Sequence, residues 1–292
     1  MRLAVILVVL LGRPALADIP RVMTDVPAVH SLAAQVMGDL GTPGILLDRG
    51  ADAHHFQLRP TQARALSQAD LVFWVGPELT PWLERALDGI GGEAQSVPLR
   101  EMTNAHEPED EDAHANAHDH DAIHAWLDPG VAGNWVDEMA HHLSGADPDN
   151  AAVYAANARQ AKERIAATAR AVEEILAPVG EGPIVTYHDA YGPFADAFGL
   201  IIAGSIAEGD AAAPGAGRLF DLRAMLADSG AVCVFPETQQ DPALVRTVTE
   251  GTNARIGAAL DPSGSTLEYG PDLYSELLTT LARRIADCAA GR

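Results

Sequence analysis

Basic residues are scarce in this sequence of 292 residues. It contains 19 Lys and Arg against 41 Asp and Glu, which gives a formal net charge of −22 at pH 7. A chain this acidic lacks the cationic surface that nucleic acids and anionic membranes bind, whereas it is compatible with cations as ligands. Plain solubility explains the same charge, so the charge alone assigns no function.

Long hydrophobic runs are also absent. The apolar run at residues 3–11 follows Arg2, precedes the small-x-small pattern of residues 15–17, and is too short to span a bilayer. No later segment is long and apolar enough to do so. This arrangement predicts a signal peptide, residues 1–17, cleaved before Asp18. No cysteine lies near the cut, so we expect an exported, soluble protein without a lipid anchor.

The chain has only two cysteines, Cys233 and Cys288. In an exported chain one disulfide between them is the expected arrangement, and two unpaired buried thiols are the alternative. Common catalytic motifs are missing too, because there is no His-Glu-x-x-His, no Gly-x-Ser-x-Gly and no cysteine beside a base. The glycine cluster at residues 89–92 lacks the Lys-Ser/Thr of a phosphate loop, so we interpret it as a turn.

Short β-branched runs alternate with helical patterns in both halves of the chain. The strand-like segments are residues 22–24, 45–47, 71–75 and 95–99, then 184–187, 200–203, 231–235 and 255–260. Strands that alternate with helices predict parallel sheets covered on both faces. The predicted fold class is therefore α/β, with two lobes that each hold a four-stranded parallel sheet. Ligands bind such folds at the carboxyl ends of the strands, here in a cleft between the lobes.

One predicted helix is longer than a single α/β layer needs. Asp147-Pro148 supplies an N-cap followed by proline at the first helical position. The pattern continues for about 45 Å at 1.5 Å per residue. We therefore predict a rigid helix over residues 148–178 that joins an N-terminal lobe, 18–147, to a C-terminal lobe, 179–292. Its predicted apolar stripe comprises Tyr154, Ala158, Ala161, Ile165, Val172 and Ile175.

A segment rich in histidine and acid, residues 104–123, follows the fourth strand. It has no apolar period of 3.6 or 2 up to Asp121, so we expect a solvated loop. Imidazole and carboxylate together favour borderline divalent ions such as zinc, and a functionless acidic loop is the alternative. The predicted weak metal ligands are His106, His114, His118 and His120. His124 differs, because the apolar residues 125–127 anchor it to the folded protein.

Four metal-binding side chains follow predicted strands, namely His54, His124, His188 and Asp261. Three imidazoles plus a carboxylate match the first coordination shell of zinc. A hydrogen-bonded loop histidine is the commoner explanation of any one of them, but their convergence from both halves favours a metal site. Glu237 is expected to orient an imidazole by a hydrogen bond rather than to act as an acid or base.

Several motifs occur in the order of a known family. They are GADAHHFQLRPTQARALSQADLVFWVGPEL, HAWLDP, YHDAYGPFADAFGL, PGAGRLFDLR, CVFPETQ and RIGAALDPSGS. With them the chain resembles the metal-specific periplasmic binding proteins of ABC importers, and among these the zinc-uptake, ZnuA-type branch. The resemblance covers nearly the whole mature chain.

The resemblance implies that His54, His124 and His188 carry the metal. The manganese branch has a carboxylate at the position of His188, so an imidazole there favours Zn²⁺. Some zinc members have Glu where this chain has Ala53. The fourth ligand must then be Asp261, water or a loop histidine, and Asp261 is the preferred choice. Cys233 and Cys288 stand where zinc-type members carry a disulfide.

The resemblance also implies a function. We expect a monomeric, non-enzymatic receptor in the periplasm that captures Zn²⁺ with high affinity and delivers it to the permease of an ABC importer. A periplasmic zinc chaperone is a second candidate partner. The alternative is an exported zinc-dependent hydrolase that uses the same histidines. A closed four-ligand shell favours transport, and a metal-bound water beside a base and a substrate-sized pocket favours catalysis.

Overall fold

The computed structural model describes residues 19–90, 94–100, 121–207, 216–229 and 232–292. The predicted signal peptide and the loop histidines His106, His114, His118 and His120 lie outside the described residues. Among the helices that are described, none is both long enough and apolar enough to cross a bilayer.

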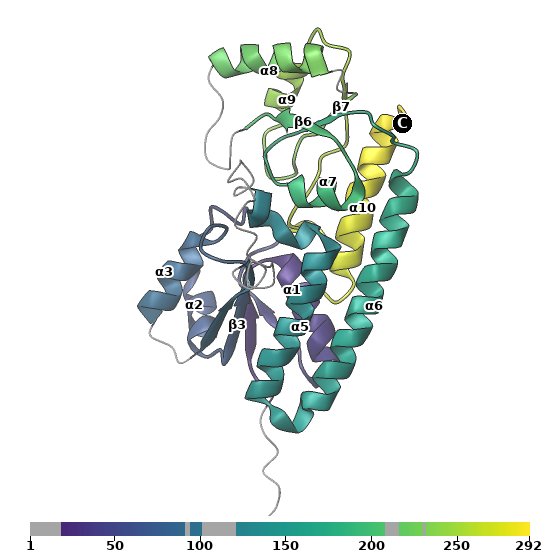
Figure 1. The fold of residues 1–292 in the computed structure, drawn as a ribbon. Coiled ribbons are helices and arrows are strands. Elements are labelled where there is room, and N and C mark those ends of the chain that lie inside the picture. Colours follow the sequence, from purple (N-terminus) through teal and green to yellow (C-terminus); the bar gives the residue numbers. More distant parts are fainter. Residues whose placement is uncertain (1–18, 91–93, 101–120, 208–215, 230–231) are drawn as a thin grey trace, which may run out of the picture.

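Two four-stranded parallel sheets form the two lobes, which confirms the predicted fold class (Figure 1). The N-terminal sheet has the order β2-β1-β3-β4, and its strands are β1 Val22–Thr24, β2 Gly44–Ile45, β3 Leu71–Trp74 and β4 Gln95–Pro98. The C-terminal sheet has the matching order β6-β5-β7-β8, and its strands are β5 Ile184–Thr186, β6 Ile202–Ser205, β7 Cys233–Val234 and β8 Arg255–Ile256. In each sheet the first strand along the chain pairs with both the second and the third.

Helices cover both sheets, and several begin at a proline. Proline suits the first helical turn, where the missing N–H has no intrahelical partner. In the N-terminal lobe the helices are α1 Pro27–Met37, α2 Pro60–Ser67, α3 Pro81–Ile90 and α5 Pro129–Ala146, with 3₁₀ turns η1 Gly38–Leu40, η2 Asp121–Leu127 and η3 Pro148–Asn150. In the C-terminal lobe they are α7 Gly192–Phe198, α8 Ala216–Ser229, α9 Ala243–Thr249 and α10 Leu273–Ala289.

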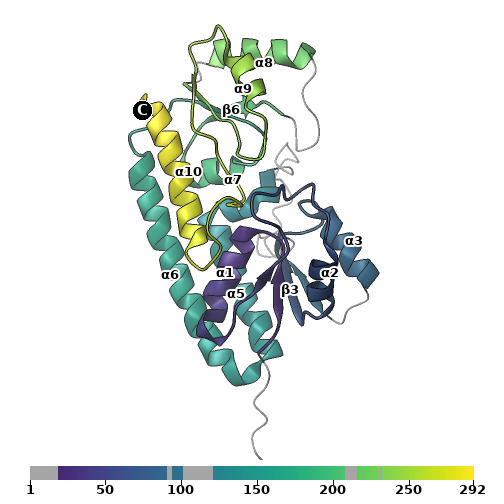
Figure 2. The same cartoon turned by 180° about the vertical axis from the view of Figure 1, so that it is seen from behind.

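The predicted joining helix is present as α6, Ala151–Leu176. Figures 1 and 2 show it beside α10, the two helices running together along one side of both lobes. Its buried stripe includes Thr168 and Leu176, whereas the predicted Ile175 is only half-buried. Thr168 fits there because its hydroxyl donates to the carbonyl of Arg164 and lies 2.8 Å from Ser275 Oγ.

The two lobes share one hydrophobic core. A single cluster of buried side chains includes Phe73 and Trp135 from the N-terminal lobe, Phe235 and Tyr274 from the C-terminal half, and Tyr154 from α6. Helix α10 contacts α1, α6 and β7, so the C-terminal helix packs against both lobes. A shared core of this kind resists large rotation of one lobe against the other.

A disulfide links Cys233 in β7 to Cys288 in α10, with Cα atoms 6.2 Å apart. This confirms the expected disulfide, and neither thiol is free. The bond attaches the C-terminal sheet covalently to the helix that packs on both lobes.

Candidate metal centre

His54 lies between β2 and α2, in a segment of the N-terminal lobe that is fixed at two points. Its backbone N–H donates to Asp52 Oδ1 at 2.9 Å, which closes a local turn. The indole of Trp82 donates to the carbonyl of Ala53 at 2.8 Å. These contacts fix the backbone on the N-terminal side of the imidazole.

His124 lies at a kink within η2, where its φ of −97° and ψ of 37° depart from helical values. Its neighbour Trp126 is fully buried and donates from Nε1 to the carbonyl of Pro262 at 2.9 Å. Tyr274 Oη in turn donates to the carbonyl of Trp126 at 2.8 Å. The apolar residues after His124 therefore anchor it, as the sequence indicates.

His188 follows β5 in the C-terminal lobe and lies against Glu237. Its Nδ1 is 2.7 Å from both carboxylate oxygens, and Tyr191 Oη donates to the same carboxylate at 3.2 Å. A carboxylate only accepts, so the proton of the neutral imidazole resides on Nδ1 and the lone pair on Nε2. Glu237 therefore makes a hydrogen bond to this imidazole, and its role in orienting a metal ligand stays a prediction.

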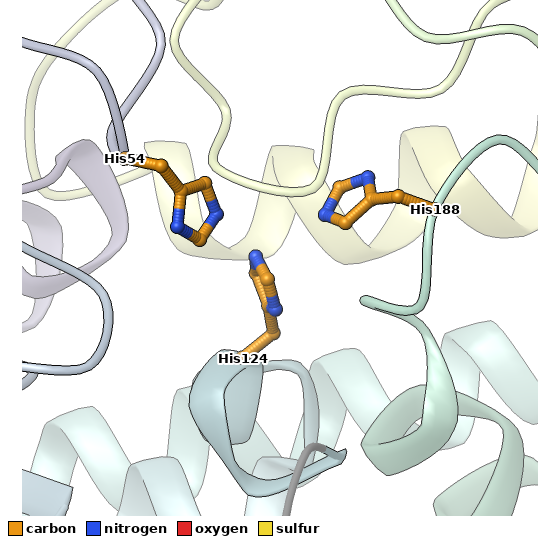
Figure 3. Close-up of side chains that lie close together, drawn as sticks. All are labelled: His54, His124 and His188. Atoms are coloured by element: carbon orange, nitrogen blue, oxygen red, sulfur yellow. The ribbon is translucent and has the colours of Figure 1, made fainter. Parts of the chain in front are cut away.

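The three imidazoles converge from three separate segments (Figure 3). One nitrogen from each of His54, His124 and His188 lies within 4.8 Å of the other two. The ring centroids are 5.2 Å apart for His124 and His188, 5.4 Å for His54 and His124, and 6.2 Å for His54 and His188. Within the described part of the chain, no other three His, Cys, Asp or Glu side chains come together in this way.

The electrostatics of His124 suit a metal ligand. Burial, followed by the nearby imidazoles of His188 and His54, lowers its pKa well below the ordinary value. The ring is therefore neutral at pH 7. In Figure 3 the nitrogen of His124 that points toward the other two imidazoles is the one farther from the backbone, Nε2. A neutral ring can present a lone pair to a cation at that position.

A small cavity of about 30 Å³ lies between these imidazoles, with Glu237, Gln239 and other polar groups in its wall. The space corresponds to about one water molecule. Pockets for organic ligands in proteins measure about 300–1,000 Å³. The cavity therefore has room for an ion and not for an organic substrate.

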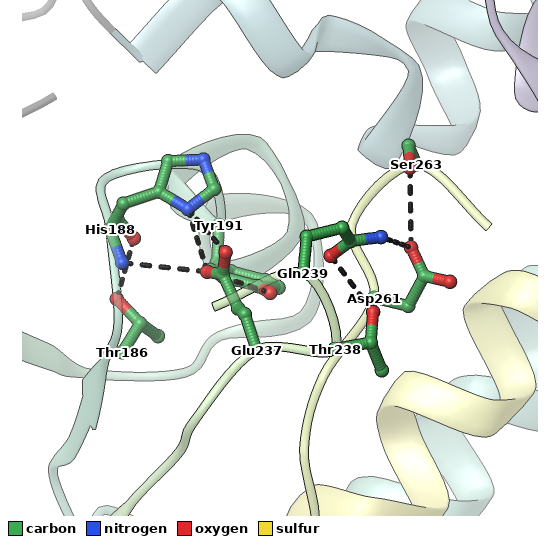
Figure 4. A network of polar contacts seen from close by, with 8 residues as sticks. All are labelled: Thr186, His188, Tyr191, Glu237, Thr238, Gln239, Asp261 and Ser263. Atoms are coloured by element: carbon green, nitrogen blue, oxygen red, sulfur yellow. Dashed lines mark hydrogen bonds and ion pairs between the residues drawn. The ribbon is translucent and has the colours of Figure 1, made fainter. Parts of the chain in front are cut away.

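The structure does not bring Asp261 into the group of three imidazoles. Its carboxylate instead accepts hydrogen bonds from residues of its own loop and from Gln239 (Figure 4). The prediction that Asp261 binds the metal stays a prediction, and these contacts count against it. Gln239 has no place among the residues that the sequence singles out. Its position two residues after Glu237, beyond the end of β7, is the signal that could have found it.

Three of the other described histidines, His30, His141 and His142, lie on helices outside this group. His30 is buried in α1, where its Nε2 lies 3.1 Å from the carbonyl of Pro43. His141 is exposed on α5, and its ring contacts that of His142. We therefore treat them as packing and surface residues.

The sequence is similar to those of known zinc-uptake proteins. The chain is 43% identical over 307 residues to the high-affinity zinc uptake system protein ZnuA of Paracoccus denitrificans, covering 94% of this chain and 93% of that protein. It is 34% identical to the ZnuA of Brucella abortus, covering 91% of each chain.

Solved structures share the fold. A crystal structure of ZnuA superposes with a TM-score of 0.76 at 23% identity, covering 93% of this chain and all of that one. The solute-binding protein FpvC of Pseudomonas aeruginosa, in complex with Mn²⁺, gives 0.78 at 18% identity, covering 93% and 98%. The family model described as zinc-uptake complex component A, periplasmic, matches residues 22–288. With this match over almost the whole described chain, the protein belongs to the ZnuA family of periplasmic zinc-uptake components.

Proposed function

We propose that this chain captures one Zn²⁺ ion between its lobes with His54, His124 and His188 and delivers it to the permease of a zinc ABC importer. The observation that carries the proposal is the convergence of three imidazole nitrogens within 4.8 Å of one another. Imidazole is a preferred ligand of zinc, and neighbouring ligand nitrogens in a tetrahedral shell are roughly 3.3 Å apart. The nitrogens therefore need to approach one another by at most about 1.5 Å, which small adjustments of the side chains and their segments can provide.

Each ligand comes from a different segment, so the ion acts as a link between the lobes. His54 belongs to the N-terminal lobe, His124 to η2, and His188 to the C-terminal lobe. An ion bound by three imidazole nitrogens from three segments stabilises the relative positions of those segments. Loss of the ion removes that restraint. The sequence-based hypothesis gives Asp261, water or a loop histidine as the fourth ligand, and the hydrogen bonds of Asp261 within its own loop favour one of the latter two.

Glu237 fixes His188 for this role. Because the carboxylate accepts from Nδ1, the other nitrogen is left to bind the ion and the ring cannot rotate freely. The same hydrogen bond raises the basicity of the imidazole.

The size of the cavity supports transport over hydrolysis. A zinc hydrolase needs space for its substrate beside the metal-bound water, whereas the space among the imidazoles is about 30 Å³. Membership of a solute-binding family points the same way. We further propose that the chain acts as a monomer, that residues 1–17 are removed on export to the periplasm, and that a zinc chaperone can supply the ion.

Calorimetric titration of the metal-free protein with Zn²⁺ tests the ligand assignment. We expect one tight site in the wild type and a loss of affinity of more than about 100-fold in each of His54→Ala, His124→Ala and His188→Ala, because even outer partners of a metal ligand are worth 10–100-fold. His141→Ala is the matched control, since His141 is an exposed histidine of α5, and it should bind like the wild type. Wild-type affinity in all three ligand variants would contradict the assignment.

A further inference from the structure

The carboxylate of Asp261 is fully engaged within the protein. Asp261 is 4% exposed. Its Oδ1 accepts from Gly264 N at 3.0 Å, Ser265 N and Ser263 Oγ at 3.2 Å, and Gln239 Nε2 at 3.1 Å. Its Oδ2 accepts from Thr266 N at 2.9 Å and Thr266 Oγ1 at 2.7 Å. A carboxylate offers about four lone-pair sites, so six donors occupy all of them.

These bonds fold residues 261–266 into a tight loop. Gly264 adopts a φ of +72°, and a Cβ there would lie 3.1 Å from Leu273 Cδ2, so only glycine fits the turn without strain. Several donors to the carboxylate are backbone N–H groups of the loop itself. If Asp261 turned towards a metal, these buried N–H groups would lose their acceptor, which is unfavourable.

The carbonyls of this loop hold the segments that carry two of the imidazoles. Pro262 O accepts from Trp126 Nε1, two residues after His124, at 2.9 Å. Ser265 O accepts from Gly50 N at 2.9 Å, and Thr266 O accepts from Arg49 Nη2 at 3.0 Å. All three bonds join the C-terminal lobe to segments of the N-terminal lobe, and the latter two reach the segment that leads to His54.

The segment of His188 is tied to the same loop through Glu237. Thr238 N donates to Leu260 O at 2.9 Å, and Leu260 N donates to Pro236 O at 2.8 Å, which pairs the Glu237 segment with the residue before Asp261. Gln239 Nε2 also donates to Ser265 Oγ at 2.6 Å. Glu237 then positions His188.

We propose that Asp261 is a positioning residue and not the fourth ligand. Its carboxylate folds residues 261–266 into an interlobe clasp that holds all three imidazole-bearing segments in register. Release of the ion requires the two bonds from Arg49 and Gly50 to this clasp to break. The inference rests on the proposed function, because it describes how the same site is held together and opened.

Substitutions of Asp261 distinguish a residue that positions the loop from a residue that binds the metal. Asp261→Asn keeps Oδ1 and most of its donors but removes the anionic ligand, whereas Asp261→Ala removes both. We expect the Asn variant to stay within about tenfold of wild-type zinc affinity and the Ala variant to lose more, in the 10–100-fold range of groups that orient metal ligands. X-ray absorption at the zinc edge should give the same ligand count in the wild type and the Asn variant. Equal losses in both variants, with one oxygen ligand missing, would overturn the proposal.

Dissociation kinetics test the crossing bonds. In stopped-flow experiments with an excess chelator, Arg49→Ala should release Zn²⁺ faster than the wild type. Arg223→Ala is the matched control, since Arg223 is an exposed arginine that donates to the carbonyl of Thr247 within the C-terminal lobe. Equal release rates in both variants and the wild type would overturn the proposed role of residues 261–266 as an interlobe clasp. The assignment of the zinc site would be unaffected. A wild type that binds no Zn²⁺ would instead contradict the proposed function.

Discussion

Asp25 is a buried carboxylate away from the three imidazoles. It follows β1, is fully buried, and accepts from Val26 N at 2.7 Å, Val75 N at 2.9 Å and Thr80 Oγ1 at 3.4 Å. These bonds connect the start of α1 to the turn after β3. Burial nevertheless outweighs them and raises the pKa of Asp25 from 3.8 to about 6.

The raised pKa predicts a pH-dependent stability. The folded state holds the Asp25 proton more tightly than the unfolded state, so this contribution is complete below pH 3.8 and is lost as the pH rises through about 6. Guanidinium unfolding of metal-free wild type and Asp25→Asn should show the wild type gaining stability relative to the variant between pH 7 and pH 4, by up to about 3 kcal/mol. A difference that does not change with pH would contradict this assignment.

Residue types and their places after strands could be predicted from the sequence, but side-chain partners could not. His54 and His188 follow predicted strands and His124 directly precedes an anchored apolar segment, so their convergence agrees with parallel-sheet topology. Asp261 follows a strand in the same way, yet its carboxylate turns into its own loop. The sequence does not reveal that Gly264 allows the turn that supplies the competing N–H donors.

At the scale of elements, long helices were predicted well and strand limits less well. The pattern over residues 148–178 matches η3 and α6 because one buried stripe persists along the helix. Helix α3 begins at Pro81 and not at the earlier Pro77, since Thr80 N donates back to Gly76 O in a turn. Strand β7 is only Cys233–Val234, because ladder pairing ends before the apolar run does.

The disulfide carries a prediction at the same scale. Cys233 and Cys288 are 55 residues apart, and closing a loop of this length restricts the unfolded chain by about 4 kcal/mol in the chain-entropy account. The double variant Cys233→Ser and Cys288→Ser should therefore unfold at lower guanidinium concentration and still bind one Zn²⁺. Labelling of the denatured, unreduced wild type should find no thiol. Two reactive thiols per chain would contradict the pairing.

At the scale of the whole molecule, the two lobes are joined by a shared core. Their shared core and the paired helices α6 and α10 oppose wide rotation. The site is instead held by a few hydrogen bonds across the cleft, which can break without disturbing the core. This division suits a receptor that must bind an ion firmly and still give it up at a membrane partner.

The metal binding of the histidine-rich segment remains a prediction, because residues 104–120 lie outside the described residues. Deletion of residues 107–119 should leave the tight zinc site nearly intact, since His124 is anchored by Trp126. Any weaker binding events should disappear, because the deletion removes His114 and His118, two of the predicted weak ligands. Calorimetry of the deletion variant checks this. Loss of the tight event would show that the loop donates a primary ligand.

The location of the ion tests the central claim most directly. Crystals of the zinc-loaded protein, measured on both sides of the zinc absorption edge, should show one strong anomalous peak about 2.0–2.1 Å from a nitrogen of each of His54, His124 and His188. The Asp261 carboxylate should remain hydrogen-bonded within its loop in the same crystals. A principal zinc peak away from these three imidazoles would contradict the account.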